Sequence, residues 1–63
     1  GVKIGNNCHI STRAVINGDV EIKDNTFIGS GAVIKEGIKI GKNCFIGMGQ
    51  SVTANLKDNS ILK

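Results

Sequence analysis

The pattern that decides the fold is clearest in Ile28-Gly29-Ser30-Gly31-Ala32-Val33 and returns in Ile40-Gly41-Lys42-Asn43-Cys44-Phe45. Both stretches begin with a branched aliphatic residue, carry glycine or asparagine at the fourth position and have a small residue at the fifth. The aliphatic position recurs at every sixth residue, as Ile4, Ile10, Ile16, Ile22, Ile28, Ile34, Ile40, Ile46 and Val52. A repeat of fixed period indicates a solenoid in which each repeat is one structural unit.

The fourth and fifth positions predict how each repeat is folded. Arg13 is the one fourth-position residue that is not Gly, Asn or Asp; the series is Asn7, Arg13, Asp19, Asn25, Gly31, Gly37, Asn43, Gly49 and Asn55. Gly, Asn and Asp adopt a positive φ at the least cost, so we expect a left-handed corner at each of these positions. The fifth position is mostly small or apolar: Cys8, Ala14, Val20, Thr26, Ala32, Ile38, Cys44, Gln50 and Leu56. Six residues thus make one short strand and one corner, and the first and fifth side chains point inward.

Three such repeats close a triangle of 18 residues. The segments Ile4–Glu21, Ile22–Lys39 and Ile40–Lys57 align with one another without a gap. We therefore predict an all-β protein, a parallel β-helix of three triangular coils of 18 residues, forming a single domain over residues 1–63. His9, Phe27 and Phe45 should stack on its outer surface.

The inward positions carry three polar or reactive residues. Cys8 and Cys44 would lie two coils, or about 9–10 Å, apart, which is too far for a disulfide, so we expect buried free thiols. Gln50 stands where an apolar residue is usual, so either its amide needs buried partners or the residue marks where the core is closed off near the C-terminus.

The composition excludes several classes of function. The net charge is +3, the basic residues are dispersed, and the only aromatic residues are Phe27 and Phe45, which argues against nucleic-acid binding. No apolar run approaches the roughly 20 residues of a membrane span, and the first residues lack the pattern of a signal peptide. Two cysteines are too few for a disulfide scaffold. We expect a cytoplasmic protein without a membrane or nucleic-acid partner.

The repeat resembles the hexapeptide-transferase superfamily. More narrowly, His9-Ile10-Ser11, Asn17-Gly18-Asp19-Val20 and Gly41-Lys42-Asn43-Cys44-Phe45-Ile46-Gly47 resemble the sialic acid and sugar O-acyltransferase branch, which includes amino-sugar N-acetyltransferases. The resemblance implies left-handed winding, against the usual right-handed crossover. It also implies a homotrimer, with acetyl-CoA as acyl donor bound between neighbouring β-helices and a small sugar as acceptor.

The resemblance also implies the chemistry. A histidine acts as general base on the acceptor amine or hydroxyl, which attacks the thioester. In similar proteins this histidine falls just before Gly1, outside the chain. We therefore assign no catalytic residue here, and we expect the chain to be a C-terminal fragment of a longer acyltransferase and inactive by itself.

The residues that the resemblance places at the acetyl-CoA cleft are His9, Gly18, Ser30 and Met48. His9 would lie near the thioester end, Gly18 near the acetyl group or the acceptor, and Ser30 and Met48 along the pantetheine arm, mainly through main-chain groups. Each has a structural alternative: His9 as a surface ring stacked under Phe27, and the glycines around Ser30 and Met48 as residues that only permit corner geometry.

Two other functions remain to be weighed. A zinc enzyme with this fold, resembling the γ-class carbonic anhydrases, would need three histidine ligands, and His9 is the only histidine, so we expect no metal. A non-catalytic β-helix that serves assembly alone is the alternative function.

Overall fold

The chain folds into ten two-residue strands joined by turns, and it contains no helix. The computed structural model describes all residues 1–63. The strands are β1 (Lys3–Ile4), β2 (His9–Ile10), β3 (Val15–Ile16), β4 (Glu21–Ile22), β5 (Phe27–Ile28), β6 (Val33–Ile34), β7 (Lys39–Ile40), β8 (Phe45–Ile46), β9 (Ser51–Val52) and β10 (Ile61–Leu62). This confirms the all-β prediction.

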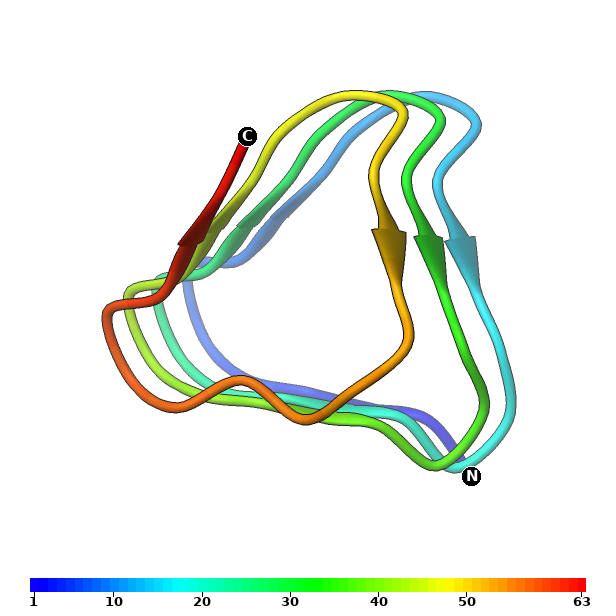
Figure 1. Cartoon of the computed structure of the whole chain (residues 1–63). Coiled ribbons are helices and arrows are strands. Elements are labelled where there is room, and N and C mark those ends of the chain that lie inside the picture. Colours follow the sequence, from blue (N-terminus) through cyan, green and yellow to red (C-terminus); the bar gives the residue numbers. More distant parts are fainter.

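The strands form three parallel sheets that are the faces of a triangular prism (Figure 1). Face A contains β1, β4 and β7, face B contains β2, β5, β8 and β10, and face C contains β3, β6 and β9. The chain visits the faces in the order A, B, C and returns to A one layer higher. Its winding is left-handed, and the first coils span 18 residues, as the repeat predicted.

The corners between faces are the two-residue turns of the repeat. The AB corner comprises residues 6–7, 24–25, 42–43 and 58–59, the BC corner residues 12–13, 30–31 and 48–49, and the CA corner residues 18–19 and 36–37. The second residue of every one of these turns has a positive φ, between 56° for Asn43 and 75° for Gly37. Eight of the nine predicted corner positions, from Asn7 to Gly49, are therefore confirmed.

The core is the column of first-position and fifth-position side chains inside the prism. Its buried members are Val20, Ile22, Ile28, Ala32, Ile34, Ile38, Ile40, Cys44, Ile46 and Val52. Ile4 and Ile10, in the first coil, remain 46% and 36% exposed because no coil lies beneath them. Stacked aliphatic side chains provide most of the stabilisation, at about 25 cal/mol for each Å² of apolar surface that they bury.

The third coil is two residues shorter than the alignment predicted. Ile22 pairs with Ile40, but Ile40 pairs with Leu56. Leu56 therefore continues the first-position column and does not occupy the predicted fifth position. Asn55 has no positive φ; its side-chain oxygen instead accepts a hydrogen bond from the Lys39 N–H, 16 residues earlier, at 2.8 Å. Asn59, at φ 65°, makes the next corner.

Two of the three inward polar or reactive residues are less buried than the sequence indicated. Both cysteines are free, as predicted, but Cys8 is only half-buried, whereas Cys44 is buried. Gln50 is also half-buried, and no buried side-chain nitrogen or oxygen in the molecule lacks a partner. The Gln50 amide therefore needs no buried partners, and its half-buried place near the open end of the core fits the second interpretation.

Candidate functional site

The BC corner is a stack of three similar turns. A backbone hydrogen bond closes each turn, for example from the Ala32 N–H to the Gly29 carbonyl at 3.2 Å. The turns are also joined along the prism axis, because the Gly31 N–H donates to the Thr12 carbonyl at 3.0 Å and the Gly49 N–H to the Ser30 carbonyl at 2.8 Å. A closing bond of this kind with a positive φ at the third residue is the pattern of a type II turn.

Ser30 and Met48 lie one above the other at this corner, as the sequence predicted. Both are exposed, and Met48 is exposed to 79%. Neither backbone N–H donates a hydrogen bond within the chain. At the AB corner the corresponding N–H of Lys42 is satisfied by the Asp58 carboxylate, at 2.8 Å. The BC corner therefore offers a stack of three free amide donors, on Thr12, Ser30 and Met48. The N–H groups of Gly18 and Glu36 at the CA corner are free in the same way.

His9 lies on face B, which adjoins the BC corner. Its ring stacks on Phe27 with centroids 5.0 Å apart and planes 9° apart, and Phe27 stacks on Phe45 at the same distance. The predicted outward stack is thus present. One face of the imidazole is used in packing, while the residue as a whole is exposed, so the ring edge is accessible.

Gly18 lies apart from the other three predicted contact residues. It is in the CA corner, with face C between it and the BC corner. It is exposed, and an added Cβ would meet nothing within 4 Å. Within one chain, therefore, His9 on face B lies next to Ser30 and Met48 at the BC corner. Gly18 lies at the CA corner, on the far edge of face C.

Gly29, which precedes Ser30, is required by coil stacking. It is buried, and a Cβ added there would lie 2.5 Å from the Met48 nitrogen and 2.7 Å from the Gly47 carbonyl carbon. No side chain fits in that space. The reason for this glycine is therefore close packing of the next coil and not corner geometry, because Gly29 has no positive φ.

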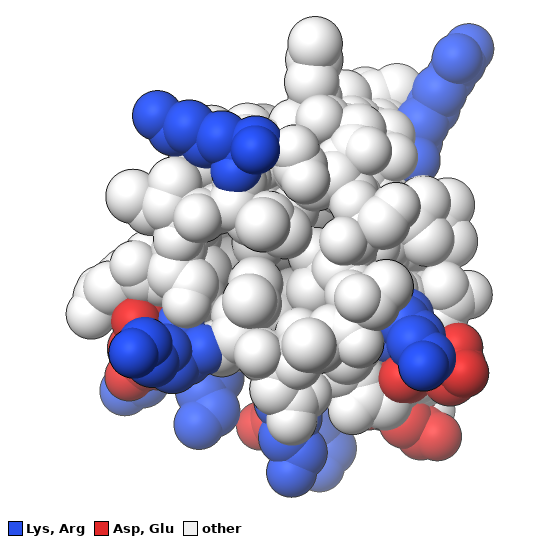
Figure 2. Space-filling view, viewed as in Figure 1, with Lys and Arg blue, Asp and Glu red and all other residues white.

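Charge is divided unequally around the prism. All five acidic residues lie on face A or its two corners, as do five lysines; these residues are Asp19, Glu21, Asp24, Glu36 and Asp58, with Lys3, Lys23, Lys39, Lys42 and Lys57. Their charges cancel. Figure 2 shows the acidic side chains only along the lower part of the view, where face A lies. The net charge of +3 therefore resides entirely in Arg13, Lys35 and Lys63.

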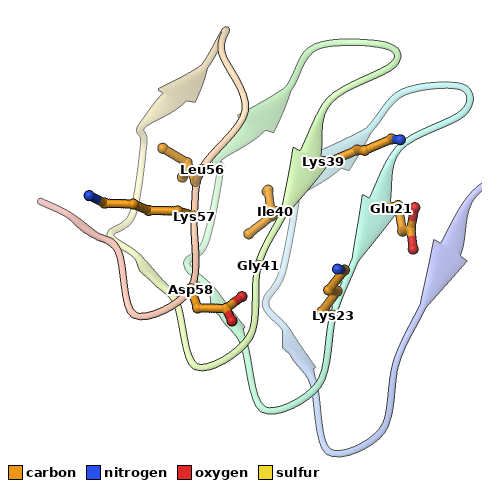
Figure 3. Close-up of a pocket in the computed structure, with 8 residues that line it drawn as sticks. All are labelled: Glu21, Lys23, Lys39, Ile40, Gly41, Leu56, Lys57 and Asp58. Carbon is orange, nitrogen blue, oxygen red and sulfur yellow. The ribbon is translucent and has the colours of Figure 1, made fainter.

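Face A carries two shallow hollows that sequence reasoning missed. The larger, of about 470 Å³, is lined by residues from β4, β7 and the Leu56 strand segment (Figure 3). Three lysines, Lys23, Lys39 and Lys57, stand there beside Glu21 and Asp58. The only ion pair in the molecule joins the amino terminus to Asp19, so these lysines have no carboxylate partner. The sequence feature that could have indicated the larger hollow is the recurrence of Lys23-Asp24-Asn25 as Lys57-Asp58-Asn59.

Comparison with protein families agrees with the fold and the repeat. Residues 1–36 match the family of the bacterial transferase hexapeptide (six repeats), and residues 20–54 match the hexapeptide repeat of succinyl-transferase. The chain belongs to the bacterial hexapeptide transferase family. Hexapeptide transferases carry out acyl transfer, and this is the general activity that the family assignment supports.

Other comparisons add no closer identification. Among curated proteins and among solved structures, none matches this hexapeptide transferase chain. No group of three or more His, Cys, Asp or Glu side chains is placed to hold a metal ion. The chain contains no helix that could span a lipid bilayer.

Proposed function

We propose that this protein takes part in acetyl-CoA-dependent transfer of an acetyl or other acyl group to a hydroxyl or amine of a sugar or amino sugar. The chain forms part of the wall of the coenzyme A cleft. The observation that carries the proposal is the pair of free N–H groups of Ser30 and Met48 at the exposed BC corner of a hexapeptide transferase.

Backbone donors of this kind suit the pantetheine arm of coenzyme A. The arm carries amide carbonyls, and successive coils present N–H groups about 4.8 Å apart. The stacked rings of His9, Phe27 and Phe45 provide a wall beside the corner. Gly18, on the CA corner, would reach the same cleft only from a neighbouring copy of the chain.

In the proposed reaction the acceptor hydroxyl or amine attacks the thioester carbonyl. A general base removes the acceptor proton, the new ester or amide bond forms, and the carbon–sulfur bond breaks to release the thiol of coenzyme A, which takes up a proton. In this proposal the residues of this chain bind and orient the donor, and none of them is assigned a proton transfer.

A homotrimer in the cytoplasm is part of the same proposal. A cyclic trimer uses two different surfaces of each subunit, which would bring the BC corner of one copy beside another face of the next. Sedimentation equilibrium tests this: a mass of three chains is expected, and a stable monomer at all concentrations would contradict the trimer.

Coenzyme A binding tests the function directly. Ser30 occupies the second position of its turn, where proline is well accepted, so Ser30→Pro removes the N–H while keeping the corner. We expect Ser30→Pro to weaken coenzyme A binding about tenfold, the effect of losing roughly 1.4 kcal/mol. Ser30→Ala is the matched control, because it removes the hydroxyl and keeps the N–H.

The alternative, a non-catalytic β-helix that serves assembly, is favoured by one observation: the only histidine is engaged in ring stacking. The two functions separate in calorimetric titration with coenzyme A. Absence of any affinity in the unaltered protein would sink the transferase proposal and leave the assembly function.

A further inference from the structure

The peptide group between Asn17 and Gly18, where face C meets the CA corner, makes no hydrogen bond within the chain. Neither the Asn17 carbonyl nor the Gly18 N–H has a partner, whereas the next carbonyl, that of Gly18, accepts from the Gly37 N–H at 2.9 Å. Gly18 is exposed, and a Cβ added there would meet nothing within 4 Å. The Gly18 nitrogen is therefore unengaged at an open corner, directly after an asparagine side chain.

This arrangement permits a reaction within the chain. The Gly18 nitrogen attacks the Cγ atom of the Asn17 amide and closes a five-membered succinimide ring. The bond from Cγ to Nδ2 breaks, and the leaving nitrogen takes up the proton of the Gly18 N–H and departs as ammonia. Water then opens the ring at one of its two carbonyl carbons, which leaves aspartate or isoaspartate, and no group is oxidised or reduced.

We propose that Asn17 is a site of spontaneous modification, at which this protein converts asparagine to aspartate and isoaspartate. The proposal does not depend on the transferase function. The six other asparagines are followed by residues that carry a side chain, which hinders approach to the attacking nitrogen. In two cases that nitrogen also donates a hydrogen bond, from Cys44 at 3.1 Å and from Leu56 at 3.0 Å.

The carbonyl of Ile34, in the coil above, restrains the reaction in the folded protein. The Asn17 Nδ2 group donates to this oxygen at 2.8 Å, and the Asn17 backbone N–H donates to the same oxygen at 3.2 Å. Attack requires Cγ to turn toward Gly18, so the side-chain hydrogen bond has to open first. An aspartate carboxylate has no N–H to donate and would lie against the Ile34 carbonyl oxygen. Isoaspartate also adds a CH₂ group to the main chain of the coil, so both products should be less stable than the original protein.

Incubation of the full chain in mildly alkaline buffer, followed by trypsin digestion and mass spectrometry, tests the site. Cleavage after Arg13 and Lys23 gives a peptide of residues 14–23 in which Asn17 is the only asparagine. We expect this peptide to gain one mass unit before any other asparagine-containing peptide does, and to separate into aspartate and isoaspartate forms. An unchanged peptide, or an earlier gain elsewhere in the chain, would overturn the proposal.

Gly18→Ala is the matched variant for the attacking nitrogen. It should keep the fold, since its Cβ meets nothing within 4 Å and Gly18 has no positive φ. We expect the added methyl group to slow the mass gain at least about tenfold, which corresponds to about 1.4 kcal/mol in the barrier. In urea, where the hydrogen bond to the Ile34 carbonyl is lost, the original chain should react faster than the folded protein. An unchanged rate in Gly18→Ala contradicts the site, and a slower reaction in urea contradicts the restraint.

Asn17→Asp makes one product directly and measures its effect on stability. We expect the melting temperature to fall by about 5 °C, because the hydrogen bond to the Ile34 carbonyl is lost. Lys35→Gln is the control: it changes the net charge by the same amount at the exposed position above Asn17, and it should leave the melting temperature within about 2 °C. Equal effects of the two variants would show that charge alone, and not the lost hydrogen bond, matters at this corner.

Discussion

Thr26 joins the second and third coils from inside the core. It is 1% exposed, its hydroxyl donates to the Gly41 carbonyl at 2.8 Å, and it accepts from the Cys44 N–H at 3.1 Å. The side chain thus occupies a position in the inward column where Cys8 and Cys44 lie in the neighbouring coils. Burial of a hydroxyl that both donates and accepts a hydrogen bond costs little free energy of folding. Leaving the Gly41 carbonyl and the Cys44 N–H buried without a partner would cost much more.

Thr26→Val should therefore destabilise the protein although it keeps the shape of the side chain. We expect a loss of about 2 kcal/mol in the free energy of unfolding, since a buried carbonyl and a buried N–H lose their partner. Urea denaturation measures it. Thr26→Ser keeps the hydroxyl and should cost less than Thr26→Val; the opposite ranking would mean that packing of the methyl group dominates.

Two glycines at different corners should respond to the same substitution in opposite ways. Gly29→Ala forces a Cβ against the Met48 nitrogen and should cost about 1–3 kcal/mol, the usual penalty of overpacking. Gly18→Ala meets open space and has no positive φ, so its stability should be unchanged or slightly higher. Thermal unfolding of the two variants side by side checks this, and equal losses would contradict the role assigned to Gly29.

At the scale of the element, the AB corner alternates between two kinds of turn. The first and third coils contain Gly5 and Gly41, and the second and fourth contain Asp24 and Asp58 at the next position. Each aspartate folds back over the glycine beneath it and accepts a backbone N–H, from Asn6 or from Lys42, at 2.8 Å.

Removing one of these carboxylates should loosen the adjoining turn. Asp58→Ala leaves the Lys42 N–H without an acceptor, so its hydrogen exchange should become at least about tenfold faster. Asp58→Asn keeps an acceptor oxygen and should protect Lys42 better than alanine does. Exchange at the Asn6 N–H, held by Asp24 two coils away, serves as the internal reference and should not change.

The AB corner also shows which part of the fold the sequence predicted and which part it did not. A strict period of six fixed the strands, the faces and the corners from Asn7 to Gly49, because inward aliphatics and left-handed corners must recur together. It failed at Asn55 and Leu56, where the residue types still fitted the period although the chain takes a shorter path. Only the recurrence of Lys-Asp-Asn, from Lys23 to Lys57, marked the true register.

The candidate site was predicted in part for a similar reason. Residue position alone placed Ser30 above Thr12 and His9 beneath Phe27. The free N–H groups and the division of charge depend on which turns are capped by side chains, and single-residue patterns do not report that. Gly29 is a further example, since the sequence does not show that the next coil leaves no room for a Cβ there.

At the scale of the whole molecule, ion pairs between side chains contribute little to folding. None of the face A lysines pairs with a carboxylate, so stability should rest on the apolar column. We expect the free energy of unfolding to change by less than about 0.5 kcal/mol between about 0.05 and 0.5 M NaCl. Under the proposed function, coenzyme A binding should weaken over the same range, because an anionic ligand would lie on the carboxylate-free side.

Chemical denaturation and calorimetric titration at matched salt concentrations would separate the two effects. A strong salt dependence of unfolding would show that the face A charges matter to the fold. Salt-independent binding would argue against a role of the carboxylate-free side of the prism in holding an anion.

The alternation at the AB corner has a consequence for how such a chain can grow or shrink. If the second coil were deleted, Gly5 would lie directly beneath Gly41, and the Asn6 N–H would have no carboxylate above it. Inserting one aspartate-bearing coil would set two carboxylates against each other with no glycine to fold over. At the AB corner, therefore, coils have to be added or removed in pairs if each of these backbone N–H groups is to keep its carboxylate.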